Sequence, residues 1–313
     1  MLSLIFQRLL HAVPVAVGVV VLAFALLYVT PSDPAQVVAG QNASAELLAE
    51  IRRDMQLDRP LHMQFLGYAE RLLHGDMGAS LIDNRPVSQE VGGALGPTLE
   101  LMFAAMLWSV PLGMLLGVVA ATHRGSWIDR AVMLVAITGL SMPTFAVGMV
   151  LIQVFAFMLE WLPVQGRGGP LWTLEGLQHV ALPALSLGFL MLGPVARLMR
   201  ASMLETVSAD FIRTARAKGI PERRVIAVHA VPNSLTSVIT VVGLLVGVLL
   251  GSAVVIESVF SWPGLGRLAS TAIAAGDLPL ATGCILVLAL AFIVINTVVD
   301  LACCVIDPRL RLR

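Results

Sequence analysis

Charge is scarce in this chain of 313 residues, and that scarcity decides its class. Only 13% of the residues are Asp, Glu, Lys or Arg and 6% are aromatic, whereas 58% are hydrophobic and the mean hydropathy is +0.88. These values lie far outside the range of soluble globular proteins. The composition therefore excludes a soluble enzyme and indicates an all-α polytopic membrane protein.

Lysine is nearly absent, which excludes one source of energy. A P-loop requires Gly-Lys-Ser/Thr, because the lysine reaches the β- and γ-phosphates while the hydroxyl holds magnesium. The chain has one lysine, Lys218, and it is followed by Gly219 and Ile220. No catalytic constellation is visible either, so we expect no enzyme activity and no catalytic residue. Active transport would need energy from another subunit, delivered through a cytoplasmic contact.

Cysteine and histidine are also few. Cys284 lies in the last hydrophobic stretch, and Cys303 and Cys304 lie near its end, so no extracytoplasmic disulfide pair is available. Reduced structural thiols and lipidation both remain open for these cysteines. The six histidines show no spacing that would place two ligands on one helix face. We therefore expect no metal site and no cofactor bound by this chain.

Long uncharged stretches supply the membrane-spanning helices. A bilayer core of about 30 Å needs roughly 20 apolar residues in a helix. Six stretches meet this length without a charge in their interior. They are Leu9–Thr30, Leu101–Ala121, Ala131–Leu159, Leu177–Ala196, Val231–Ile256 and Leu278–Val299. The first is expected to be an uncleaved helix, because no small-x-small cleavage pattern follows it.

The distribution of basic residues predicts the orientation. If the N-terminus is cytoplasmic, thirteen of the twenty basic residues fall inside, because Arg8, Arg124, Arg130, the seven between Arg197 and Arg224, and Arg309, Arg311 and Arg313 share that side. The positive-inside bias selects this arrangement, with both termini cytoplasmic. Ion-coupled carriers keep ionisable side chains at membrane depth as relays. The interiors of the six stretches have none.

The expected organisation has three parts. Residues 1–30 form the N-terminal segment and first transmembrane helix, residues 31–96 an extracytoplasmic segment, and residues 97–313 the transmembrane domain with a cytoplasmic loop at about 197–230. In the external segment, two short amphipathic helices are predicted from two apolar stripes, one of Leu47, Leu48, Ile51 and Met55 behind Glu46 and one of Leu61, Phe65, Leu66, Leu72 and Leu73 before Gly75. A docking platform for an outside partner and a simple cover over the helices remain equal alternatives.

Glycine recurs every fourth residue in two of the spans, at Gly113 and Gly117 and at Gly243, Gly247 and Gly251. Such stripes allow close backbone approach between helices in lipid. Packing within the subunit and lining of a moving pathway are both open for them. Prolines at 111, 143, 183 and 194 are expected to kink or break helices, which suits a bundle around a cavity.

The most informative stretch is the basic loop between the fourth and fifth spans. Ser208 is a plausible N-cap with Asp210 in the first turn, and Phe211, Ile212 and Ala215 form one apolar edge. Gly219 then ends this helix. Pro221 and Glu222 begin a second helix that runs through Pro232 into the fifth span. The pattern predicts a lever joined to a transmembrane helix; the alternative is an interfacial amphipathic loop.

This loop resembles a family motif. Permeases of binding-protein-dependent ABC importers carry a cytoplasmic Glu-Ala-Ala, three residues, Gly, nine residues, Ile-x-Leu-Pro. In this chain Ala215, Gly219 and Pro232 match that spacing, while Arg213 and Thr214 replace the Glu and first Ala, and His229 replaces the Ile. In such permeases the motif forms a short coupling helix that is seated in a groove of the ATPase subunit.

The resemblance is closest to the dipeptide/oligopeptide (peptide/nickel) branch, in its first-permease, dipeptide permease B-like type. It extends along the chain through short segments in the same order: Gln7-Arg8, Pro31-Ser-Asp-Pro34, Leu57-Asp-Arg-Pro60, His74-Gly-Asp-Met-Gly78-Ala-Ser80, Pro97-Thr-Leu-Glu-Leu101, Pro263-Gly-Leu-Gly-Arg267, Gly276-Asp277-Leu-Pro279 and Asp307-Pro-Arg-Leu-Arg311. It implies the type I ABC importer permease fold in a bacterial inner membrane.

The resemblance also implies partners: a homologous second permease, two ATP-binding cassette subunits that hold ATP and Mg, an external solute-binding protein and the lipid bilayer, with no nucleic acid. It places Asp210, Ala215, Gly219, Ile220, Pro221, Glu222 and Pro232 at the ATPase coupling site. The implied cargo is a dipeptide or oligopeptide, with glutathione, nickel or a nickel chelate as alternatives. Channels or ion-coupled carriers that act alone, and scaffolds that transport nothing, are the competing classes.

Overall fold

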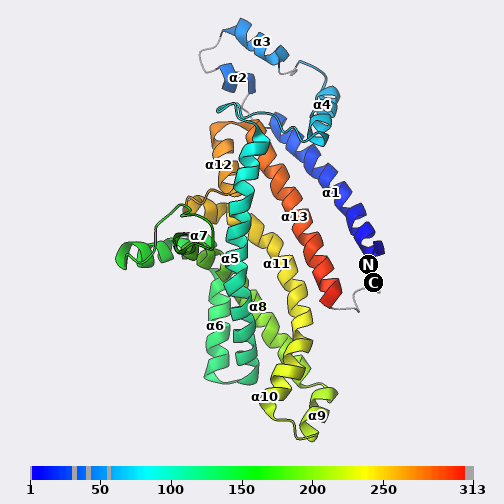
Figure 1. Cartoon of the computed structure of the whole chain (residues 1–313), viewed down its shortest axis with the longest axis vertical. Coiled ribbons are helices and arrows are strands. Elements are labelled where there is room, and N and C mark those ends of the chain that lie inside the picture. The colour runs from blue at the N-terminus through cyan, green and yellow to red at the C-terminus, as the bar shows by residue number, and fades with distance from the viewer. Residues whose placement is uncertain (1, 30–33, 40–43, 55–57, 307–313) are drawn as a thin grey trace. The chain divides into compact units, whose positions relative to one another are not determined.

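The computed structural model describes residues 2–29, 34–39, 44–54 and 58–306 (Figure 1). Thr30, most of the Pro31–Pro34 segment, Met55, Leu57 and the closing segment Asp307–Arg311 therefore lie outside the described residues. Within them the regular secondary structure is helical, with loops between the helices and one isolated bridge between Ala79 and Pro86. The fold divides into two units, one of residues 100–262 and 294–313 and the other of residues 2–99 and 263–293.

The first unit is built around one long helix, α8 (Leu174–Val207), which packs against α6 (Trp127–Ser141), α7 (Thr144–Leu151) and α11 (Val231–Val259). Its buried face carries Leu182, Leu187, Met191, Met199 and Met203, each fully enclosed. The unit also contains α5 (Val87–Thr122) from Glu100 onward and the end of α13 (Leu278–Ile306). Long side chains facing three neighbours explain why α8 has the largest buried share of the apolar helices.

Among the described residues, four helices are long and apolar enough to cross a membrane, and a bent pair makes a fifth. The four are α5, α8, the continuous helix Glu222–Val259 and Leu278–Val299 of α13. The described apolar stretch of α1 (Leu2–Val29) covers Ala12–Ala25, which is shorter than a full span. The expected all-helical membrane fold is confirmed, while the count of six spans stays a prediction.

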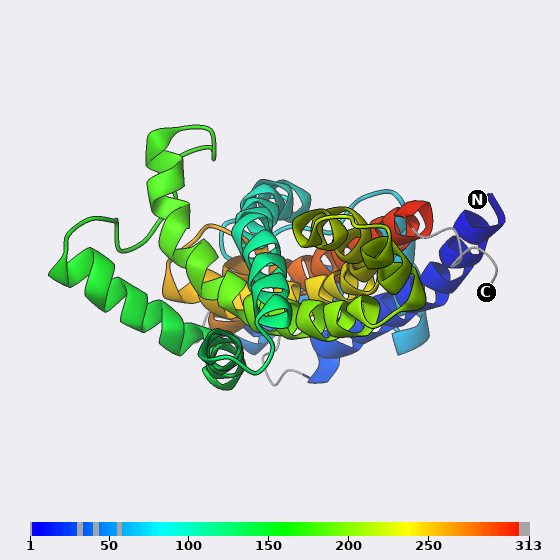
Figure 2. The same cartoon turned by 90° about the horizontal axis from the view of Figure 1, so that it is seen from below.

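The third expected span is broken. Trp127–Gly139 and Thr144–Met158 differ in direction by 104°, so that Figure 2 shows α6 nearly end-on while α7 and the π-helix η1 (Ile152–Met158) lie across the view. Met142 and Pro143 separate the two helices. The predicted break at Pro143 is thus confirmed. By contrast, α5 and α8 remain helical through Pro111, Pro183 and Pro194, so the break expected as one alternative does not occur there.

The second unit contains the described residues of the expected external segment. The two predicted helices are present there as α3 (Ala45–Asp54) and α4 (Leu61–Leu73), and a further short helix, α2 (Pro34–Ala39), precedes them. Phe24 of α1 contacts Phe65 and Tyr68 of α4, with ring centroids 5.3 and 5.8 Å apart. No residue of α4 is buried, so its predicted apolar stripe is covered only in part.

Two further features of this unit were not expected from the sequence. Helix α5 begins at Val87, well before the predicted span. In the sequence, an additional helix, α12 (Leu265–Ala275), follows α11 and precedes α13. Both follow from one buried cluster, in which the first turns of α5 pack against α12 and the start of α13. Ser80 donates a hydrogen bond to Asp277, which joins two of the segments that carry the family resemblance.

Candidate functional site

The site predicted from the sequence lies where α8 and α11 meet, at α9 (Asp210–Ala217) and α10 (Glu222–Arg224) (Figure 1). We call residues 208–224 the elbow. The prediction that Ser208 is the N-cap of α9 is wrong. The Ser208 hydroxyl donates to the carbonyl of Glu205 at 2.7 Å and so ends α8, and Ala209, with an extended backbone, precedes α9. A serine hydroxyl can satisfy the last carbonyls of one helix as well as the first N–H groups of the next.

Helix α9 is held to the membrane helices by one face. Ile212 is fully buried and Ala215 nearly so, in a cluster with Met199 and Met203 of α8 and Val238 of α11. Phe211, which was expected on the same apolar edge, is 47% exposed. The apolar face of α9 is therefore narrower than predicted, and a large aromatic side chain remains uncovered beside it.

The bend after α9 is a Schellman motif. Gly219 has a φ of +75°, its N–H donates to the carbonyl of Arg216 at 2.9 Å, and the N–H of Ile220 donates to the carbonyl of Ala215 at 3.4 Å. The half-buried Ile220 side chain packs on the cluster that holds Ala215. This pattern satisfies the last carbonyls of α9, and its left-handed residue favours glycine. The predicted stop at Gly219 is confirmed.

An ion pair closes the bend. Pro221 precedes α10 as its N-cap residue, and Glu222 is the first helical residue. The guanidinium of Arg216 binds the carboxylate of Glu222 through Nε–Oε2 and Nη2–Oε1 contacts of 3.1 and 2.7 Å. The Glu222 carboxylate raises the pKa of the Arg216 guanidinium. The two helices of the elbow are thereby joined by their side chains as well as by the chain.

The second helix of the elbow continues into the membrane without interruption, as predicted. α10, the π-helix η2 (Val225–Ala230) and α11 form one helix from Glu222 to Val259. The wider turn at η2 lies just before Pro232, which has no N–H to donate and crowds the preceding turn. Asn233 Nδ2 donates to the carbonyl of His229 at 2.7 Å and supports this irregular turn.

Three hydroxyl side chains fasten the end of α8 to the start of α11. Ser234 is fully buried, and its Oγ lies 3.0 Å from Oγ1 of Thr206. The hydroxyl of Ser202 donates to the carbonyl of Ser234 at 3.2 Å. In a membrane protein, where apolar burial does little to hold helices together, such bonds help to fix one helix against another. Displacement of α9 is therefore expected to move α8 and α11 together.

A second ion pair ties α6 to α8 near Ser202. Arg200 Nε and Nη2 bind the two carboxylate oxygens of Asp129 at 2.6 and 2.7 Å. The backbone N–H of Gly125 also donates to Asp129, and Ser126 caps α6 through the N–H of Asp129. Asp129 is 4% exposed. Through these contacts its carboxylate holds the α5–α6 turn on α8.

The glycine stripes occupy different surroundings. An added Cβ at Gly117 would lie 2.6 Å from the carbonyl of Ala196, and one at Gly113 would lie 3.0 Å from the Val195 side chain, so both face α8 closely. Gly243 faces Val299 of α13 in the same way. Gly247 is half-buried, and a Cβ added at Gly251 would meet no atom within 4 Å.

Several residues of this region were missed by the sequence analysis. Arg216 gave no signal, because its partner lies six residues away across a turn and outside the helical i, i+4 spacing. The serine and threonine residues that join α8 to α11 look like ordinary span-end residues. Among the described residues, no three His, Cys, Asp or Glu side chains gather as a metal site.

Comparisons with known proteins identify the family of this chain. Residues 113–312 match the family described as binding-protein-dependent transport system inner membrane component, and residues 1–87 match the N-terminal part of such membrane components. The glutathione transport system permease proteins GsiC of Salmonella choleraesuis (strain SC-B67) and Escherichia coli (strain K12) are 42% and 41% identical over 311 residues, covering 99% of each chain.

The fold has a counterpart among solved structures. The MetNI methionine ABC transporter in an inward-facing conformation superposes with a TM-score of 0.59 and 15% identity, covering 70% of this chain and 97% of that chain. An identity this low supports the fold alone. With the match to the family over most of the sequence, this chain belongs to the inner membrane permeases of binding-protein-dependent transport and is a permease subunit of an ABC importer.

Proposed function

We propose that this chain forms half of the translocation pathway of an importer for short peptides or peptide-like cargo in a bacterial inner membrane. The observation that carries the proposal is the elbow, a hydrogen-bonded helical bend that is anchored by the buried side chains of Ile212 and Ala215 and is continuous with a transmembrane helix. Work done on α9 by a partner can be passed to α11 because their connection has little freedom. Without a P-loop lysine, the chain needs such a partner.

The coupling surface that we propose consists of Asp210, Ala215, Gly219, Ile220, Pro221 and Glu222, with Pro232 at the base of the lever. Asp210 is 96% exposed and Glu222 54% exposed at their side chains, so both are accessible to an ATPase subunit. Ala215 and Ile220 pack inward and set the angle of α9. Phe211 is a large exposed side chain on the same helix and extends the proposed contact.

The proposed assembly contains a homologous second permease, two ATPase subunits on the cytoplasmic side and a solute-binding protein outside. ATP-driven closure of the ATPase pair would draw the two elbows together and open the pathway outward, so that the binding protein releases its cargo. Hydrolysis of ATP would then reset the transporter. The proposed orientation, with both termini cytoplasmic, rests on the excess of basic residues on the elbow side.

Peptide-like cargo is supported by the full-length similarity to glutathione permeases. Glutathione is itself a tripeptide with one unusual linkage, so the two cargo classes share amide groups and small size. Nickel and nickel chelates are the second candidates. The described parts of the spans hold no cluster of metal-binding side chains, so capture of a metal would fall to the binding protein.

Reconstitution tests the proposal. Proteoliposomes with this chain alone should take up neither glutathione nor trialanine, whereas the chain with its second permease, ATPase subunits and binding protein should take up at least one of them when ATP is supplied. The elbow should be protected from protease on ATPase binding. Uptake by the lone chain would support a carrier or channel instead, and uptake of nickel alone by the assembly would move the cargo assignment to metal.

A further inference from the structure

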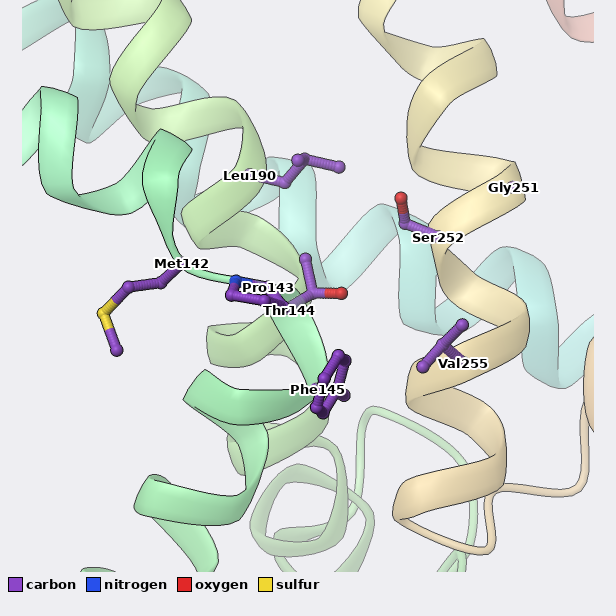
Figure 3. Close-up of a pocket in the computed structure, with 8 residues that line it drawn as sticks. All are labelled: Met142, Pro143, Thr144, Phe145, Leu190, Gly251, Ser252 and Val255. Carbon is purple, nitrogen blue, oxygen red and sulfur yellow. The ribbon is translucent and has the colours of Figure 1, made fainter.

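A hollow of about 480 Å³ lies at the break between α6 and α7, and α8 and α11 complete its wall (Figure 3). Pro143, Thr144 and Phe145 come from the break, Leu190 from α8, and Gly251 and Ser252 from α11. No residue of the lining carries a formal charge. The volume falls within the range of small-molecule sites, about 300 to 1,000 Å³.

The broken backbone indicates that this hollow does not face lipid. Met142 and Pro143 stand outside helical structure in the middle of a stretch that is apolar enough to span a membrane. Peptide groups freed from a helix are costly in hydrocarbon, so non-helical backbone at membrane depth is tolerated only where protein buries it or where it lines an aqueous cavity. Met142 and Phe145 are each more than 40% exposed, so protein does not bury the break within the described chain.

Two hydroxyl groups that face the hollow have no hydrogen-bond partner among the described residues. In Figure 3, the Thr144 side chain is directed toward α11, where Ser252 lies on the opposite wall. Within the described part of the chain, neither hydroxyl makes a hydrogen bond. Other span hydroxyls bond their own helix: Thr138 donates to Leu134 and Ser258 to Val254, each at 2.9 Å.

Gly251 borders the hollow, and packing against another helix does not explain its lack of a side chain. Of the glycine stripe on α11, Gly243 closely faces Val299, so packing accounts for its lack of a side chain. A side-chain carbon at Gly251 would meet no atom of this chain within 4 Å, so helix packing does not require glycine there. A larger residue would instead occupy open space beside α11, at a position that borders the hollow.

We propose that this hollow is a cargo-contact site in the translocation pathway, at which the Thr144 and Ser252 hydroxyls hydrogen-bond to the amide groups of a short peptide while the absence of a side chain at Gly251 leaves room for a cargo side chain. The inference rests on the proposed function for the cargo class. A neutral lining with two adaptable hydroxyls binds amides of any sequence weakly, which suits a site that cargo must leave as well as enter.

Thiol labelling tests whether the hollow is aqueous, whatever the cargo. In a chain with its three native cysteines replaced by alanine, Ser252→Cys and Ala253→Cys are compared within the assembled importer. Ala253 is the adjacent residue and is 1% exposed. A membrane-impermeant maleimide added to the outside, with ATP and vanadate present, should react at least about tenfold faster at position 252. Equal rates at the two positions would overturn the proposal.

Uptake measurements test the contacts themselves, with trialanine, trileucine and glutathione as probes. Thr144→Val and Ser252→Ala should each lower uptake at limiting probe roughly threefold to tenfold, the loss of about one hydrogen bond. The matched variants Thr138→Val and Ser258→Ala should retain wild-type uptake. Gly251→Leu should reduce trileucine uptake at least about tenfold more than trialanine uptake.

The outcomes separate the two proposals. If the wild-type assembly takes up none of the three probes, the peptide assignment fails, while the labelling contrast still decides whether the hollow is an aqueous site. If peptides are taken up, but Gly251→Leu slows all of them equally and the hydroxyl variants match their controls, the hollow is not a cargo-contact site. Wild-type uptake by Gly251→Leu would lead to the same conclusion.

Discussion

The guanidinium of Arg216 and the carboxylate of Glu222 form a two-point ion pair across the bend between α9 and α10. Both side chains are partly exposed, so the pair adds little to the stability of the fold. Its effect is geometric, because it restricts the angle between a helix at the proposed ATPase contact and the helix that continues into the membrane. The pair therefore bears on coupling more than on folding.

Glu222→Gln should leave insertion and complex yield unchanged but lower the amount of cargo taken up per ATP hydrolysed. The charge reversal Arg216→Glu with Glu222→Arg should restore much of that ratio, because the same two points are joined again. Arg213→Gln is the matched control, since Arg213 pairs with Asp210 inside α9 and does not cross the bend. Equal effects of Glu222→Gln and Arg213→Gln on the ratio would contradict the geometric role.

Gly219→Pro should insert normally and fail to couple transport to hydrolysis. Proline can adopt neither the φ of +75° nor the hydrogen bond from residue 219 to Arg216, so the Schellman motif is lost. Gly219→Asn is the control, because asparagine tolerates the left-handed region. ATPase activity and uptake in proteoliposomes are measured side by side. Coupled wild-type transport by the proline variant would refute the lever.

Asp129→Asn should destabilise the α6–α8 contact by about 2 kcal/mol, the scale of hydrogen bonds to charged groups. The change removes the charge that Arg200 binds within a nearly buried site. Thermal unfolding of the purified complex in detergent provides the measurement. Asp83→Asn, at an exposed carboxylate outside both this contact and the coupling surface, should leave the transition unchanged, and an unchanged transition for Asp129→Asn would show that the pair does not hold the turn.

Gly117→Val should impair folding of the permease by about 1 to 3 kcal/mol, because α5 could not approach α8 as closely. The same change at Gly251, where no atom of the chain is near, should leave the yield of monodisperse complex at the wild-type level. Size-exclusion profiles of the two variants make the comparison. Similar losses at both glycines would mean that close packing is not what distinguishes them.

Local turn chemistry made part of the elbow predictable. Gly219 and Pro221 each act through their own backbone, so the end of α9 and the beginning of the next helix could be located from the sequence alone. The side chains that α9 buries were harder to predict. Phe211 was placed on the apolar edge, but the covering residues Met199, Met203 and Val238 come from distant helices and meet Ile212 and Ala215 instead.

The same distinction holds for the fold. Spans were visible as apolar runs, but the early start of α5 and the whole of α12 depend on packing against each other, and their mixed composition gives no long apolar run. From the sequence, Ser208 could cap either α8 or α9. In the structure its hydroxyl donates to the carbonyl of Glu205, so it caps the end of α8. The glycine stripe on α11 was one pattern in the sequence, yet Gly243 and Gly251 have different surroundings.

If α9 drives the permease as a lever, the elbow and the membrane part of α11 must move as one body. Spin labels at Thr214→Cys and Leu244→Cys, both exposed positions, report their separation by pulsed electron resonance in the assembled importer once the native cysteines are replaced. We predict one distance distribution that is the same without nucleotide and with ATP and vanadate, while uptake persists. A distribution that shifts with nucleotide would show that the elbow bends independently of α11, and the lever would then be wrong.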